Sequence, residues 1–223
     1  DGGVYIHAGP EIGVAATKTF TSQVTVLTLL GLLFGRIHHL SSTDGIEMID
    51  ELEAIPEKIA SILKQTDKIK AIAEKHANAE AMLFMGRQIN YPVAMEGALK
   101  MKEISYIYAS GHPRAELKHG VIALVKPDLP SVFIAPDDAV FDKNVSNIEE
   151  VLARKGPVIA VTTEGRTELE RLTDDVIYVP ECPPYLSPLL TVIPLQLFSY
   201  YLAVARGCDV DKPRNLAKSV TVE

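Results

Sequence analysis

Apolar runs and helix-like patterns alternate along most of this chain. Strand-like apolar runs occupy residues 81–85, 131–135, 158–162 and 176–179. Helical patterns occupy residues 91–108, 139–154, 167–174 and 186–206. Such alternation is typical of βαβ units built on a parallel sheet. We therefore expect an α/β fold, with one doubly wound parallel-sheet domain arranged as a three-layer sandwich.

The first part of the chain has a different order of elements. Residues 4–7 predict a short strand, 17–37 an apolar helix, and 44–76 a polar helical region that Pro56 interrupts. One strand cannot build a sheet, so this part is interpreted as the end of an earlier α/β domain. The chain also opens on Asp1 rather than Met, and we expect it to be a fragment of a longer polypeptide.

These patterns divide the chain into four parts. The expected divisions are the end of a first domain at 1–42, connecting helices at 43–72, a second domain at 73–214 and a C-terminal tail at 215–223.

Charge and cysteine content narrow the function classes. A net charge of −7 disfavours a nucleic-acid partner, which needs a basic face to neutralise phosphates. Cys182 and Cys208 are the only cysteines, and their spacing predicts neither a disulfide framework nor a metal site. A reducing cytoplasm suits these two cysteines best, and the sequence offers no secretory signal.

Two uncharged stretches, 19–35 and 183–205, could be taken for membrane spans. The first has 17 residues, which is short for a span of about 20, and the second holds Pro188 and Pro194. We interpret both as buried helices or helices at a subunit interface, with no membrane partner.

Three charged residues share one face of the 91–108 helix. Glu96, Lys100 and Glu103 follow at spacings of four and three. A surface salt-bridge ladder, worth about 0.3 to 0.5 kcal/mol per pair, would give the same pattern. His119 in AELKHG is a second candidate, since imidazole exchanges protons near neutral pH, although a lone histidine is more often structural.

The tail DVDKPRNLAKSVTVE, at 209–223, is polar in an order that fits neither a helix nor a strand, and could be a frayed terminus. Together with EGALKMKEIS at 96–105 and AELKHG at 115–120, however, it resembles the isomerase half of the glutamine:fructose-6-phosphate amidotransferase (glucosamine-6-phosphate synthase) family. That half is built from two flavodoxin-like sugar-isomerase (SIS) domains. The resemblance runs from AGPEIGVAATK to the last residue.

The resemblance implies a catalytic set. Glu103 would move a proton between C1 and C2 of the open-chain sugar, and Lys100 would stabilise the developing oxyanion beside it. His119 would open the sugar ring in the site of a neighbouring subunit, which implies a homodimer. Lys218 would bring an amine to the substrate as the tail closes over it.

The resemblance also implies substrate contacts at Val14, Ala16 and Ala217. This chain departs from the family pattern in having Ala16 where Ser is common, Ala115 where Gly is common and Val121 where Pro is common. The first departure removes one hydroxyl contact to the sugar.

The implied function is conversion of fructose 6-phosphate and ammonia to glucosamine 6-phosphate, with no cofactor and no metal. A glutaminase domain and the phosphate-binding loop would precede this chain, so we expect the fragment to be inactive alone. Two alternatives remain open, namely an SIS deaminase or deglycase and a non-catalytic sugar-phosphate-binding module.

Overall fold

The computed structural model describes residues 2–218 and has a five-stranded sheet with the order β2-β1-β3-β4-β5. Its strands are β1 Ala81–Gly86, β2 Tyr108–Pro113, β3 Ser131–Ala135, β4 Val158–Thr163 and β5 Val176–Val179. All neighbouring strands pair in parallel. The expected doubly wound parallel sheet is confirmed.

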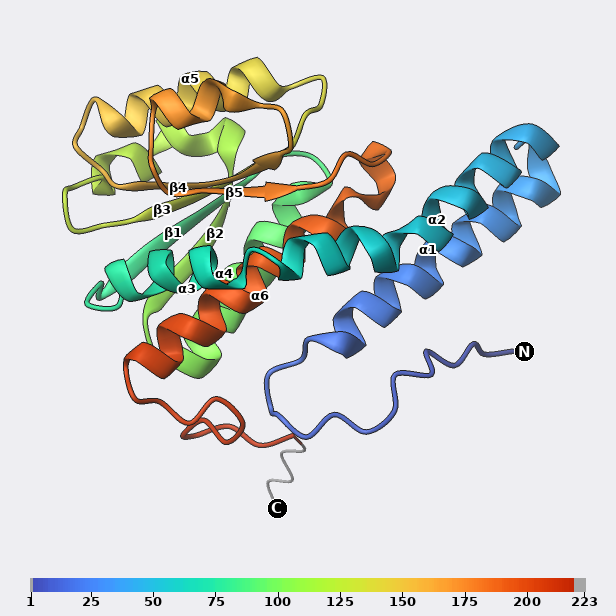
Figure 1. Ribbon diagram of the computed structural model, residues 1–223, viewed down its shortest axis with the longest axis horizontal. Coiled ribbons are helices and arrows are strands. Elements are labelled where there is room, and N and C mark those ends of the chain that lie inside the picture. The colour runs from blue at the N-terminus through green and yellow to red at the C-terminus, as the bar shows by residue number, and fades with distance from the viewer. Residues whose placement is uncertain (1, 219–223) are drawn as a thin grey trace.

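Helices cover both faces of this sheet. The α-helices of the described residues are α1 Lys18–His38, α2 Ser42–Leu63, α3 Thr66–Lys75, α4 Asn90–Ser105, α5 Phe141–Leu152 and α6 Ser187–Ala205. Short 3₁₀ helices are η1 Arg114–His119, η2 Val121–Leu124, η3 Thr167–Arg171 and η4 Pro184–Leu186. Figure 1 shows α3, α4 and α6 on one side of the sheet and α5 on the other.

Strands β1, β3, β4 and β5 send alternate side chains into two separate cores. In β1, Met82 and Phe84 join the core under α4 and α6, whereas Leu83 and Met85 join the core under α5. All four side chains are at most 3% exposed. Because both faces are covered, the strands are apolar throughout instead of alternating with polar residues.

Helix α4 approaches its neighbours closely because glycines stand at the contacts. It packs against β1, β2 and α6. A Cβ on Gly97 would lie 2.7 Å from Leu195 Cδ1, and one on Gly111 would lie 2.7 Å from the Met95 Cα. At the β1–α4 turn, a Cβ on Gly86 would lie 2.0 Å from the Asn90 carbonyl oxygen. These contacts fix the position of α4 on the sheet.

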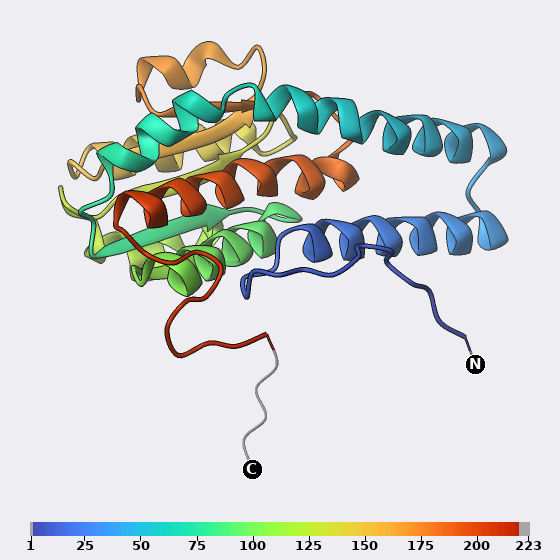
Figure 2. The same ribbon diagram turned by 60° about the horizontal axis from the view of Figure 1, so that its bottom comes forward.

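Helices α1 and α2 form a hairpin that extends away from the sandwich (Figure 2). Both α1 and the segment 184–205 are long and apolar enough to cross a membrane by length and composition. In the apolar 18-residue window of the segment 184–205, 61% of the residues are buried, whereas in the window of α1 only 6% are buried. The second is therefore a buried core helix, which is one of the two expected alternatives. Helix α1 leaves a large apolar surface exposed.

Several local expectations are also wrong. Residues 4–7 form no strand, and α2 runs through Pro56, whose missing N–H removes a single helical hydrogen bond. Residues 167–174 form only the short η3. The strand β2 was not expected. The other helices match within a few residues.

The β1–α4 turn generates a stability prediction. Gly86→Ala should destabilise the chain by about 2 to 3 kcal/mol, because its new methyl group meets backbone that cannot rotate away. Gly31→Ala, in α1 with nothing within 4 Å of its added Cβ, is the control and should stabilise by up to about 1 kcal/mol. Urea unfolding measures both, and equal midpoints for the two variants would contradict the close approach.

Candidate active site

A buried lysine between two carboxylates is the centre of the candidate site. Lys100 Nζ lies 2.7 Å from Glu103 Oε2 and 3.4 Å from Glu96 Oε1. The lysine side chain is only 4% exposed, whereas Glu96 is 12% and Glu103 21% exposed. The three residues share one face of α4 as expected, but they do not form a surface ladder.

The electrostatics of this group are unbalanced, since one ammonium faces two carboxylates. Burial raises the pKa of Glu96, the Lys100 ammonium opposes that rise, and the Glu103 carboxylate adds to it. Glu103 is the more exposed of the two acids. Neither carboxylate lines the cavity beside Lys100, while Lys100 provides positive charge in a poorly solvated place.

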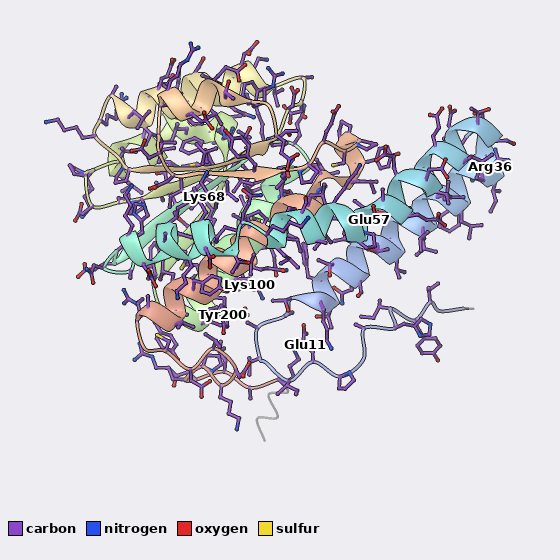
Figure 3. The ribbon with its side chains drawn as sticks, in the orientation of Figure 1. Glu11, Arg36, Glu57, Lys68, Lys100 and Tyr200 are labelled. Carbon is purple, nitrogen blue, oxygen red and sulfur yellow. The ribbon has the colours of Figure 1, made fainter. Side chains whose placement is uncertain are left out.

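A cavity of about 200 Å³ lies beside Lys100. Its lining comes from the N-terminal loop, α4, α6 and the tail: Glu11, Gly13, Ala15, Thr17, Lys100, Ile104, Gln196, Tyr200, Val210 and Asp211. In Figure 3, Glu11, Lys100 and Tyr200 are labelled near one another in the lower middle of the view. Segments from both ends of the chain thus meet at one pocket.

Glu11 holds this end of the pocket together. Its Oε1 accepts a hydrogen bond from the Thr17 N–H at 2.9 Å, and its Oε2 accepts from Thr19 Oγ1 at 2.7 Å and from Lys218 Nζ at 2.8 Å. Burial alone would raise the pKa of Glu11, but the bonds from Lys218, Thr17 and Thr19 lower it to about 2. The carboxylate is therefore ionised across the ordinary pH range.

The tail is docked against the domain as far as the structure describes it. The Val14 N–H donates to the Asp211 carbonyl at 3.1 Å. The Arg214 N–H donates to Tyr106 Oη at 2.8 Å, and the Arg214 guanidinium stacks 4.1 Å from the Tyr106 ring centroid. Lys218 ends this path on Glu11. Up to residue 218 the tail is not a frayed terminus, and 219–223 lie outside the described residues.

The other expected site residues are placed unequally. Val14 contacts the tail through its backbone, and Ala16 and Ala217 lie in the same two segments without lining the cavity. His119 is exposed at the end of η1, beyond the carboxyl end of β2. His119 does not line the cavity beside Lys100. Within one chain, His119 and Lys100 are not brought together.

Among the cavity-lining residues that sequence reasoning missed are Glu11, Gln196 and Tyr200. Glu11 is an acidic residue in an otherwise uncharged loop, which could have marked it. Gln196 interrupts the apolar run of α6 and could have done the same. Tyr200 carried no such signal, because aromatic residues are ordinary in a core helix.

No metal site is evident in the part of the chain that the structure describes. Among residues 2–218, no three His, Cys, Asp or Glu side chains are grouped so that they could hold a metal ion. Cys182 and Cys208 are free thiols.

Comparisons with known proteins agree on one family. The SIS domain family model matches residues 76–206. A curated relative, glutamine–fructose-6-phosphate aminotransferase [isomerizing] of Chlorobaculum tepidum, is 56% identical over 99% of this chain. The chain spans only 36% of that relative's length.

Solved structures give the same fold. The C-terminal domain of glucosamine-fructose-6-phosphate aminotransferase from Francisella tularensis superposes with a TM-score of 0.86 and 38% identity, covering 92% of this chain and 58% of that one. Glucosamine-6-phosphate deaminase from Thermotoga maritima superposes with a TM-score of 0.72 at 24% identity, covering 96% and 59%. The second likeness concerns the fold alone.

The buried lysine generates a pH-dependent prediction. Lys100→Met should cost about 3 kcal/mol of stability at pH 8, because Glu96 and Glu103 then face each other without a cation. Burial already raises the folded-state pKa of Glu96, and loss of the ammonium removes the contact that opposes this rise, so the cost is full above the raised pKa and shrinks as pH falls towards 5. The free energy of unfolding of the variant and the wild type, measured at pH 8 and at pH 5, gives this cost. Lys102→Met, on the exposed face of α4, is the control, and a cost for Lys100→Met that does not change with pH would contradict the arrangement.

Proposed function

Because the chain belongs to the SIS-domain family, we propose that it is the isomerase part of a glutamine–fructose-6-phosphate aminotransferase. The observation that carries this proposal is the Lys100–Glu103 pair at 2.7 Å beside a cavity. The identity with the curated relative supports it. The substrate is then fructose 6-phosphate and the product glucosamine 6-phosphate.

The geometry suits a proton shift between neighbouring carbons. Ammonia condenses with the C2 carbonyl of the open-chain sugar, and water leaves as the imine forms. Glu103 then removes a proton from C1 and returns it to C2, while the proton of the C1 hydroxyl passes to the imine nitrogen, which leaves an aldehyde at C1 and an amine at C2; a single carboxylate thus acts first as base and then as acid. Lys100 stabilises the negative charge that develops on the C1 oxygen, because its ammonium is held in a site with little water.

The remaining expected residues take supporting roles in this proposal. His119 opens the sugar ring from the neighbouring subunit, which makes the working unit a homodimer. Lys218 brings its amine to the sugar, and Val14, Ala16 and Ala217 contact it. Phosphate contacts and a glutaminase domain that supplies ammonia belong to parts of the protein beyond this chain, which spans 36% of its relative. The two free thiols suit a cytoplasmic location.

The assignment of Glu103 is tested in the full-length protein. Glu103→Gln should lower glucosamine 6-phosphate formation by at least about 100-fold, because the amide keeps the shape of the carboxylate but cannot exchange a proton. Binding of fructose 6-phosphate, measured by calorimetry, should persist. Glu74→Gln on the exposed face of α3 is the control. Normal turnover by the variant would refute the role, and a wild-type protein that releases ammonia from glucosamine 6-phosphate without needing glutamine would favour a deaminase.

The shared site is tested by subunit complementation. His119→Ala and Glu103→Gln proteins should each be inactive, but co-refolded mixtures should recover about a quarter of the wild-type activity. Half of the random dimers are mixed, and each of these has one intact site of two. Mixtures no more active than either parent would place His119 in its own subunit's site or outside catalysis.

A further inference from the structure

The amine of Lys218 has three acceptors around it in this ligand-free structure. Its Nζ donates to Glu11 Oε2 at 2.8 Å, to the Gly13 carbonyl at 2.9 Å and, more weakly, to the Val14 carbonyl at 3.4 Å. An ammonium group has three protons to donate. All of them are directed to the loop. Lys218 therefore has no spare donor for another molecule.

Glu11 is the only charged member of this set of acceptors. Its side chain is 8% exposed, against 44% for Lys218, so the glutamate is the fixed partner and the lysine the movable one. Its other oxygen is tied to the start of α1 by the Thr17 N–H. The carboxylate also lines the cavity beside Lys100. A single residue thus joins the first helix, the pocket and the C-terminal tail.

We propose that Glu11 is the positioning residue that holds the Lys218 amine at the rim of the cavity and keeps the tail docked until substrate binds. The role of Lys218 towards substrate rests on the proposed function, whereas the docking of the tail by Glu11 does not depend on it. When the sugar binds, the amine exchanges at least one of its loop acceptors for the substrate, while Glu11 retains the segment close by. Glu11 acts through Lys218 and is not a catalytic residue.

Glutamine is a suitable replacement because it separates the two tasks of the carboxylate. An amide oxygen can still accept from the Thr17 N–H, so Glu11→Gln preserves the tie to α1. It loses the negative charge that holds the ammonium. Glu53→Gln, on an exposed position of α2, controls for removal of an acid elsewhere.

The first measurement needs no substrate. Trypsin cleavage after Arg214 in the full-length protein reports opening of the tail, with release of the C-terminal peptide followed by mass spectrometry. We expect cleavage about tenfold faster in Glu11→Gln and in Lys218→Met than in wild type, because a charge-assisted hydrogen bond is lost. Equal rates in Glu11→Gln and Glu53→Gln would overturn the docking role.

The second measurement uses turnover in a double-mutant cycle. Glu11→Gln should lower kcat about tenfold or more and change KM less, and this effect should disappear in the Lys218→Met background, because Glu11 acts only through the amine. Glu11→Asp, which keeps the charge, should recover part of the loss. If the two substitutions act independently, so that their fold-changes in kcat multiply in the double variant, the proposal is overturned. A wild-type protein that does not turn over fructose 6-phosphate would count against the proposed function alone, since cleavage still reports the docking.

Discussion

The close seating of α4 on the sheet is the constraint on which the rest of this structure depends. Gly86, Gly97 and Gly111 remove the side chains that would otherwise separate the helix from β1, β2 and α6. At that distance, the inward face of α4 has room for small and apolar residues, yet it also carries Lys100. Burying an ammonium is costly unless it is paired, and Glu96 and Glu103 supply the pairing. The packing thereby produces the electrostatics of the pocket.

Much of this arrangement could be predicted from local pattern. Strands buried on both faces are apolar over their whole length, so β1, β3, β4 and β5 were recognisable. β2 was not, because YASGHP is short, partly exposed at the sheet edge and ends in proline. The spacing of Glu96, Lys100 and Glu103 was visible too, but whether that face met solvent or the protein depended on α6, far away in the sequence.

The role of Glu11 could not be predicted from local pattern at all. Its partners Thr17 and Thr19 are near in sequence, but Lys218 is 207 residues away. No periodicity encodes such a pair, and the residues between them determine it only by folding.

The exposed apolar face of α1 is the opposite case. Its sequence predicts burial, and in residues 2–218 it is left largely uncovered. That surface is suited to contact with protein outside this chain.

The contact between Glu11 and Lys218 also has a consequence for the order of folding. Joining residues so far apart in an unfolded chain would cost a large loop entropy, whereas the folded sheet and α6 already bring the two segments close. We therefore expect the contact to become favourable only after the domain has formed and to be absent from the folding transition state. Changes in the tail should leave the folding rate untouched and act on unfolding instead. Before the tail of a newly made chain docks, the α/β domain is already complete.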